Sequence, residues 1–157
     1  MRNERTEAAK FIAWNDGFVA AKSGQLLNSN GGAVLYTGEN GLEVFVSDYC
    51  NHRISVFDSS TGAFLRHMGV GQLKGPWGLA LSLTGVASQG GDYLLYACDN
   101  GNHRVQTFNA RTGAHIGFLG EVLLNGPYGL KIHAGSEGKS LLFVTDCGNK
   151  KIEVLEL

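Results

Sequence analysis

The stretch VFVSDYCNHRISVF, from Val44 to Phe57, returns twice further along the chain, as LYACDNGNHRVQTF (Leu95 to Phe108) and FVTDCGNKKIEVL (Phe143 to Leu155). Each copy is an apolar run, an Asp, two residues, an Asn and two mostly basic residues, followed by an alternating apolar run. The anchoring aspartates lie 51 and 47 positions apart: Asp48, Asp99 and Asp146. A repeat of about fifty residues therefore organises the chain, and such a period determines architecture.

Two further landmarks keep the same register. The segments GPWGLAL (Gly75 to Leu81) and GPYGLKI (Gly126 to Ile132) lie 51 positions apart, and GQLLNSNG (Gly24 to Gly31) matches GQLKGPWG (Gly71 to Gly78) at an offset of 47. The N-terminal third is thus a decayed copy. We expect an N-terminal extension over residues 1–10, and repeats over residues 11–28, 29–74, 75–125 and 126–157.

Within one repeat the pattern predicts four short strands, each bounded by Gly, Asn or Asp turn residues. They are Gly78–Ser82, Tyr93–Cys98, Arg104–Asn109 and Ala114–Leu119. The same register predicts two N-terminal strands, Phe11–Trp14 and Gly17–Ala21. A single four-stranded meander cannot bury both faces, so successive copies must stack. The sequence therefore predicts an all-β fold, a β-propeller of four-stranded antiparallel blades that is incomplete, with about three blades in this chain.

The triplets Asn51-His52-Arg53 and Asn102-His103-Arg104, each preceded by the anchoring Asp and followed by an apolar strand, a Thr-Gly turn and Gly-Pro-x-Gly-Leu, resemble the NHL repeat. The third copy departs, with Asn149-Lys150-Lys151 in place of the triplet. The resemblance implies a propeller that docks protein or, in some members, single-stranded RNA. Some proteins with this repeat are ubiquitin ligases whose chemistry resides in a separate RING domain, so a ligase role here would be partner binding only.

The bulk composition selects no charged partner. With 13 Lys and Arg against 14 Asp and Glu the formal net charge is −1, so no global positive field attracts nucleic acid or an anionic membrane. No apolar stretch approaches the length of a membrane span and no signal peptide is recognisable, so we expect a soluble, cytoplasmic protein without a membrane partner. The three cysteines show no CxxC spacing, which favours reduced thiols.

Alternate turns of a meander point the same way, so the turns after the second strands and the crossovers between blades should share one face. Loops on a rigid scaffold commonly bind partners. The candidate partner-binding residues on this face are Lys74, Trp77, Tyr128, Asn51, His52, Asn102, His103, Asn149 and Lys150. An RNA alternative combines base stacking by Trp77 or Tyr128 with phosphate contacts from Lys74, Arg53 and Arg104, against which the balanced charge argues.

Other repeated residues have structural explanations. Asp48, Asp99 and Asp146 are expected to satisfy turn backbone groups, and Arg53 and Arg104 to form ion pairs beside them. The aromatic residues predicted to form the core between blades are Trp14, Phe45, Phe57, Phe108, Phe118 and Phe143.

No set of residues indicates catalysis. The glutamates fall in turns at unrelated repeat positions, as Glu39, Glu43, Glu121 and Glu137 show. No nucleophile turn is present, and the sequence indicates neither a metal nor a cofactor. We expect a non-catalytic protein-interaction scaffold, with an unidentified protein partner bound at the turn face or at an open edge. Self-association could complete the propeller. The alternatives are a single-stranded RNA-binding module and a fragment of a metal-dependent propeller hydrolase or lyase.

Overall fold

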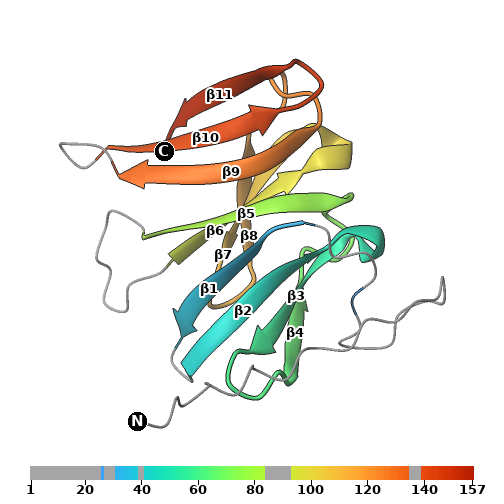
Figure 1. The fold of residues 1–157 in the computed structure, drawn as a ribbon, viewed down its shortest axis with the longest axis vertical. Coiled ribbons are helices and arrows are strands. Elements are labelled where there is room, and N and C mark those ends of the chain that lie inside the picture. The colour runs from blue at the N-terminus through green and yellow to red at the C-terminus, as the bar shows by residue number, and fades with distance from the viewer. Residues whose placement is uncertain (1–25, 27–30, 39–40, 84–92, 135–138) are drawn as a thin grey trace, which may run out of the picture.

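In the computed structural model, which describes residues 26, 31–38, 41–83, 93–134 and 139–157, the chain forms three antiparallel sheets (Figure 1). The first contains β1 (Ala33–Gly38), β2 (Gly41–Asp48), β3 (Arg53–Asp58) and β4 (Phe64–Met68). The second contains β5 (Pro76–Leu83), β6 (Tyr93–Asp99), β7 (Arg104–Asn109) and β8 (His115–Leu119). The third contains β9 (Pro127–Ala134), β10 (Ser140–Asp146) and β11 (Lys151–Glu156).

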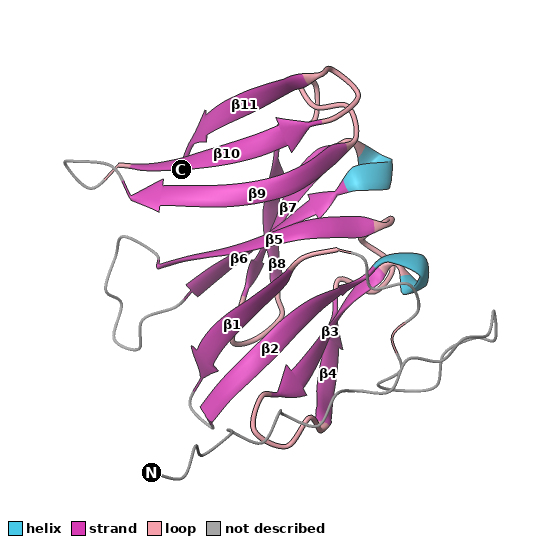
Figure 2. Cartoon of the chain, viewed as in Figure 1, coloured by secondary structure: helices cyan, strands magenta, loops and turns pink. Residues whose placement is uncertain are grey.

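Strands lie in chain order within every sheet, so each sheet is a meander, and the sheets follow one another in chain order. The predicted all-β fold of an incomplete propeller is confirmed. The predicted strands Phe11–Trp14 and Gly17–Ala21 lie outside the described residues, as do the extension and most of the first repeat. Two single-turn 3-10 helices, η1 (Tyr49–Asn51) and η2 (Asn100–Asn102), join the second and third strands of the first two sheets (Figure 2). No helix in the described ranges has the length and apolar character needed to cross a membrane.

Each sheet has two faces because successive side chains of a strand point to opposite sides. We call the face that meets the next sheet along the chain the forward face, and the opposite one the backward face. In one core, Phe45, Ile54 and Val56 of the first sheet's forward face pack with second-sheet residues such as Leu95 and Phe108. These side chains are completely buried, and burying each contributes about 1.5–3 kcal/mol.

A second core repeats this arrangement one sheet further on. There, Tyr96, Cys98 and Val105 from the forward face of the second sheet pack with Leu142 and Val144 of the third. The two cores use equivalent positions of the repeat, so the sheets stack by one recurring interface. The resulting layers run from the first sheet at the bottom of Figure 1 to the third at the top.

The predicted aromatic core is confirmed for Phe45, Phe57 and Phe108, which are at most 1% exposed. Phe143 is half-buried. Phe118 contradicts the prediction, since it is 46% exposed. It lies on β8, the outermost strand of its sheet, where the Arg104 guanidinium stands 4.8 Å above its ring. Trp14 lies outside the described residues.

The first strands of the three sheets, β1, β5 and β9, are neighbours in space. At the start of β5 the approach is so close that a Cβ on Gly78 would lie 2.6 Å from the carbonyl oxygen of Tyr128. The amide of Gly32 likewise donates to the carbonyl of Trp77 at 2.8 Å. The second glycine of the GPWG motif is therefore required by contact between backbones of adjacent sheets, which is a typical use of glycine.

Candidate functional site

The turn face gathers the sequence-predicted residues at one end of the sheets. It comprises the turns at 49–52, 100–103 and 147–150 and the crossovers at 70–75 and 122–126. Figure 2 shows both 3-10 helices at the end where β5 and β9 begin. Hydrogen bonds join turns to crossovers: the amide of Gly101 donates to the carbonyl of Lys74 at 2.9 Å, and that of Gly148 to the carbonyl of Asn125 at 2.7 Å. The predicted common face is confirmed.

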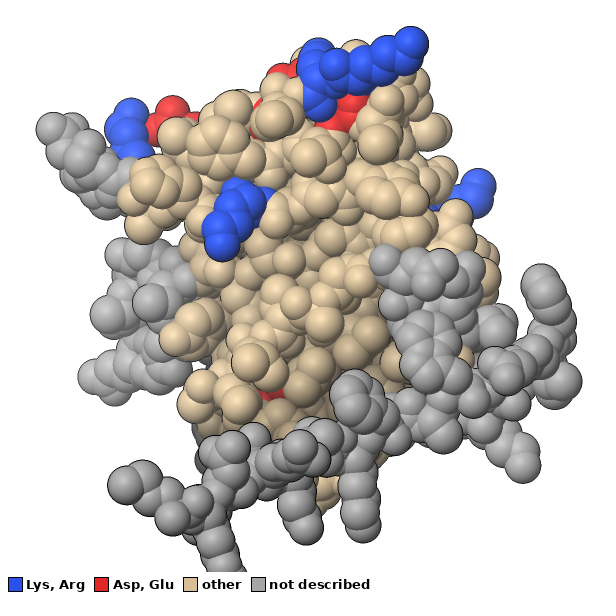
Figure 3. Space-filling view, viewed as in Figure 1, with Lys and Arg blue, Asp and Glu red and all other residues tan. Residues whose placement is uncertain are grey.

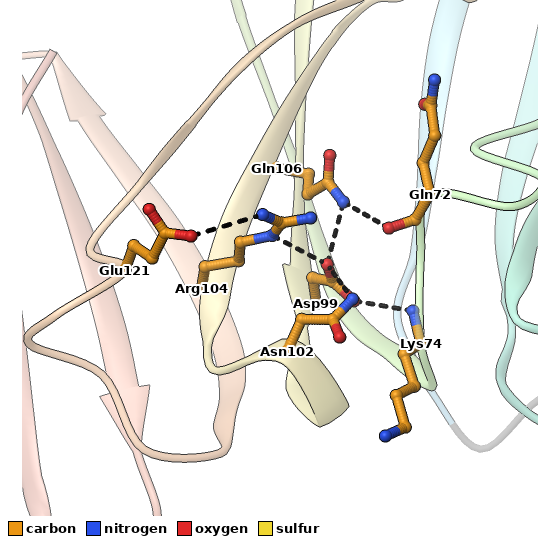
Figure 4. A network of polar contacts seen from close by, with 7 residues as sticks. All are labelled: Gln72, Lys74, Asp99, Asn102, Arg104, Gln106 and Glu121. Atoms are coloured by element: carbon orange, nitrogen blue, oxygen red, sulfur yellow. Dashed lines mark hydrogen bonds and ion pairs between the residues drawn. The ribbon is translucent and has the colours of Figure 1, made fainter.

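Asp99 is the centre of a buried polar network (Figure 4). Its Oδ1 accepts from the backbone amide of Lys74 at 2.7 Å. Its Oδ2 accepts from Asn102 Nδ2 at 2.8 Å, Gln106 Nε2 at 2.8 Å and Arg104 Nε at 3.2 Å. One carboxylate thus holds the crossover from the preceding sheet, the 3-10 turn and the next strand together. Buried carboxylates are tolerated only when so compensated.

Gln106 extends this network to the crossover, because its Nε2 also donates to the carbonyl of Gln72 at 2.6 Å. On the far side, Arg104 lies 3.7 Å from a carboxylate oxygen of Glu121. Neither Gln106 nor Glu121 stands out in the sequence as a partner of the anchor, because the positions equivalent to Gln106 hold Ser55 and Glu153.

The other two anchors vary this arrangement. Asp48 accepts from Asn51 Nδ2 at 2.8 Å and Arg53 Nε at 2.9 Å. Asp146 accepts from the backbone amide of Asn125 at 2.8 Å and from Asn149 Nδ2 at 2.7 Å. All three anchors are at most 1% exposed. The three aspartates therefore accept hydrogen bonds from the turns and crossovers, and Arg53 and Arg104 form ion pairs with Asp48 and Asp99.

The histidines of the triplet connect each turn to the following crossover. His52 and His103 have φ of 54° and 57°, in the left-handed region, which closes the 3-10 turn. Their Nδ1 atoms accept hydrogen bonds at 3.0 Å from the backbone amides of Gly75 and Gly126. Each glycine follows its histidine by 23 positions, and this constant spacing is the signal that would reveal the contact in the sequence. Lys150 takes the same conformation in the third copy.

These contacts bear on the predicted binding residues. The side-chain amides of Asn51, Asn102 and Asn149 are engaged by the anchors, and one nitrogen of His52 and of His103 is engaged by a crossover. Partner contact by these five residues and by exposed Lys150 stays a prediction, which for the engaged residues would use their remaining atoms and edges.

An aromatic row joins the η1 turn of the turn face to the first residues of β5 and β9. The rings of Trp77 and Tyr128 stack with centroids 4.1 Å apart and planes 24° apart. Tyr49, from η1, also contacts Trp77, with ring centroids 5.1 Å apart and planes tilted by 54°. Tyr128 is 41% exposed. Tyr49 was not predicted as part of this row, because its repeat equivalents are Asn100 and Cys147 and no periodic signal marks it.

Lys74 contributes a positive charge to the crossover that precedes β5, next along the chain to Gly75, where a Cβ would lie 2.8 Å from the ring of Tyr49. Its backbone is held at both ends, by Asp99 and by the amide of Gly101, whereas its side chain is exposed and points away from the carboxylate (Figure 4). The view in Figure 3, onto β1, β5 and β9, shows a surface with few charged side chains, most of them near its rim. The site offers aromatic rings and the exposed lysines Lys74 and Lys150.

The described residues form no metal centre. Among them no group of three or more His, Cys, Asp or Glu side chains lies where it would hold a metal ion. Cys50, Cys98 and Cys147 are free thiols. Burial raises the pKa of the Cys98 thiol well above its usual range, so this group is a buried hydrophobe rather than a nucleophile.

The three stacked sheets define a partial β-propeller, and hydrogen bonds between turns and crossovers hold its turn face together at one end of the blades. No protein-family model matches the chain, and no curated protein matches it. Among solved structures, hydrazine synthase of Kuenenia stuttgartiensis aligns with 87% of this chain at 16% identity and a TM-score of 0.49. This chain spans 38% of that chain. A likeness at this level identifies neither a family nor an activity.

Proposed function

We propose that this chain is a non-catalytic protein-interaction scaffold of the NHL type that binds a protein partner through its turn face. The observation that carries the proposal is the row of Tyr49, Trp77 and Tyr128, together with the exposed Lys74 on the crossover that leads into β5. Tyrosine and tryptophan are enriched among residues that dominate binding energy, because each buries a large area at a small entropic cost.

The backbone beneath the row supports this role. The crossover at Lys74 is held by the carboxylate of Asp99 and the amide of Gly101, and the next amide along is held by the ring of His52. A surface held in this way loses little conformational entropy when a partner binds, which favours affinity. The NHL-like triplets would then serve the site indirectly, by fixing the loops that carry it.

The charges favour protein over single-stranded RNA. The RNA alternative requires Arg53 and Arg104 to contact phosphate, but their Nε atoms donate to the buried carboxylates of Asp48 and Asp99. Lys74 and Lys150 remain as exposed lysines of the turn face. A groove that tracks a nucleic-acid backbone needs several such cations, so a peptide or protein surface with an acidic group suits the face better.

The proposal is tested by affinity capture with the wild-type full chain and three variants as bait. Tyr128→Ala shortens the exposed end of the aromatic row, Lys74→Glu reverses the charge beside it, and Ile116→Ala is the matched control. Ile116 is 56% exposed on β8, away from the turn face. We expect proteins retained by the wild type and by Ile116→Ala to be lost with both turn-face variants, and direct binding of the purified partner to weaken at least tenfold, about 1.4 kcal/mol.

Equal retention of every captured protein by all variants would contradict binding at this face. A second measurement separates the RNA alternative, using a fluorescent oligouridine and the purified chain at two salt concentrations. Protein binding predicts no saturable signal, whereas an affinity that falls steeply with salt and is lost with Lys74→Glu would establish the RNA alternative instead.

A further inference from the structure

Each crossover of the turn face is held by three hydrogen bonds that recur at equivalent positions of the repeat. In the first crossover, the Lys74 amide donates to Asp99 Oδ1 at 2.7 Å, and the Lys74 carbonyl accepts from the Gly101 amide at 2.9 Å. The Gly75 amide donates to His52 Nδ1 at 3.0 Å. Of these three bonds, the third depends on an imidazole, the kind of group that ordinarily changes charge between pH 5 and 8.

The second crossover repeats all three bonds. The Asn125 amide donates to Asp146 Oδ1 at 2.8 Å, and the Asn125 carbonyl accepts from the Gly148 amide at 2.7 Å. The Gly126 amide donates to His103 Nδ1 at 3.0 Å. The histidine contact is therefore a recurring part of the turn face and not a property of one side chain.

The two histidine contacts require neutral imidazole rings. Nδ1 accepts the hydrogen of a backbone amide only while it carries no proton itself, so the proton of each neutral ring lies on Nε2. An imidazolium has a donor at both nitrogens and no acceptor. The rings of His52 and His103 are exposed, so water can supply the second proton. Protonation would then set two donors against each other in place of each hydrogen bond.

The turn itself does not need the imidazole. Lys150 occupies the equivalent position of the third copy and takes the same left-handed conformation, with φ of 56° against 54° and 57° for His52 and His103. A lysine side chain has donors only and cannot accept an amide hydrogen. What the ring adds at the two histidine positions is therefore an acceptor for the crossover and not the conformation of the turn.

Charged groups of the turn and of the crossover accompany each contact. At His52 they are Arg53, whose Nε donates to Asp48, and Lys74, whose side chain is exposed. Protonation of His52 adds a charge of the same sign as these two basic neighbours, so repulsion adds to the loss of the acceptor. At His103 the charged groups are Arg104, Asp99, Glu121 and Asp146.

The contact at Gly75 supports the aromatic row. Gly75 is buried, and a Cβ at this position would lie 2.8 Å from the ring of Tyr49, so that ring packs against the backbone that His52 holds. Trp77 follows two residues later and contacts both Tyr49 and Tyr128. Release of the Gly75 amide would therefore loosen the backbone beneath the row.

We infer that His52 and His103 are acid-sensitive contacts that regulate binding at the turn face. Their neutral rings hold the crossovers, and their protonation releases them. The inference rests on the proposed function, since it concerns regulation of that same site. With both rings neutral the face is preorganised, whereas with both rings protonated a partner must first order the crossovers, which lowers its affinity.

The test is amide hydrogen exchange of the full chain by NMR at pH 7 and pH 5, where carboxyl groups ordinarily stay charged. Protection factors remove the dependence of intrinsic exchange on pH. We expect the protection of the Gly75 and Gly126 amides to fall about two- to tenfold at pH 5, as the loss of one hydrogen bond implies. The amides of Gly62 and Gly113 donate to carbonyls in the turns after β3 and β7 and serve as internal references that should not change.

Two substitutions at His52 fix the contact in one state each. His52→Asn places an oxygen on the side-chain carbon that carries Nδ1; this oxygen accepts but does not titrate, and Asn tolerates the left-handed conformation. His52→Lys supplies donors only, and Lys150 shows that the turn accommodates lysine. We expect Gly75 protection to stay high at both pH values in the first variant and low at both in the second, while Gly126 keeps its pH dependence in each. His133→Asn, which removes an exposed imidazole near the end of β9, should change neither amide.

The response of the aromatic row is measured separately. Trp14→Phe leaves Trp77 as the single tryptophan, and its fluorescence is quenched with acrylamide, a neutral probe. Quenching should be stronger at pH 5 than at pH 7, and adding His52→Asn should abolish the difference.

Equal protection of Gly75 at pH 7 and pH 5 in the wild type would overturn the inference, as would a fall of its protection with pH in His52→Asn. Quenching of Trp77 that does not change with pH would overturn the regulation of the row. Neither measurement involves a partner. If affinity capture failed while both gave the expected results, the proposed function would be rejected and the acid-sensitive contacts would stand.

Discussion

Replacing Asp99 with Asn tests whether the buried anchors hold the sheets together. The Asp99 side chain is fully buried, and its carboxylate accepts from the Lys74 amide and from Asn102, Arg104 and Gln106. Asn keeps the shape but removes the charge, and it presents either a single acceptor oxygen or an NH₂ group toward donors that all approach with hydrogens. The substitution therefore leaves several buried donors without a suitable acceptor.

The magnitude follows from the number and kind of contacts. A hydrogen bond to a charged group contributes about 1.5–3 kcal/mol, and removing one partner of a buried ion pair costs about 3–5 kcal/mol. Since Arg104 is 21% exposed, water recovers part of its loss. We expect the free energy of unfolding to fall by about 3–5 kcal/mol, a large share of the 5–15 kcal/mol that is typical of single domains.

The assay is equilibrium urea unfolding followed by circular dichroism, with Asp146→Asn as the matched variant. Asp146 is equally buried but accepts from only the Asn125 amide and Asn149 among the hydrogen bonds described above. Its substitution is expected to cost about 1–3 kcal/mol. If Asp146→Asn destabilised the protein as much as Asp99→Asn, convergence of donors would not be what makes Asp99 important, and the reasoning would be refuted.

Three further predictions concern local geometry and pH. Gly101→Ala should lower the free energy of unfolding by about 1–3 kcal/mol, because its Cβ would lie 2.9 Å from the carbonyl oxygen of Lys74. The control Gly117→Ala should not, because no atom lies within 4 Å of the Cβ that it would add. Equal urea midpoints for the two variants would contradict this prediction. Hydrogen bonds from Ser60 and Thr61 lower the pKa of Asp58 from 3.8 to about 2. The stabilising contribution of Asp58 is therefore complete above pH 4 and is lost as pH falls from 4 toward 2. If the free energy of unfolding of Asp58→Asn fell with pH as steeply as that of the wild type, this contribution would be excluded. Burial lowers the pKa of His67 below 6.5, so the wild type should lose stability relative to His67→Gln as pH falls below 6.5, and parallel pH profiles for the two proteins would rule this out.

The strands were predictable because their signals are local. Turn residues bound each strand and the alternation of side chains repeats with the period of the chain, so Arg104–Asn109 was predicted with the bounds that the structure shows. Beside them, the aspartate and arginine at the ends of β6 and β7 face each other across the register, so their ion pair also follows from a short segment.

Other features depend on which sheet lies next to which. The exposure of Phe118 follows from the position of β8 at the outside of its sheet, although the repeat alone suggests a core residue. The row of Tyr49, Trp77 and Tyr128 brings together one residue from each of three successive copies of the repeat. No periodicity within one copy of the repeat places those rings in contact, and the site was therefore predicted only in part.

The sequence by itself determined the repeat, the four-stranded unit and the common face of turns and crossovers, because backbone hydrogen bonding and side-chain alternation act over a few residues. Tertiary structure alone decided how those units are joined. The carboxylate of Asp99 reaches a crossover amide 25 positions earlier, and the ring of His52 reaches the amide of Gly75. Such contacts, like the exposure of Ile152, depend on the stacking of whole sheets, since burial is a property of the assembled layers and not of any one segment.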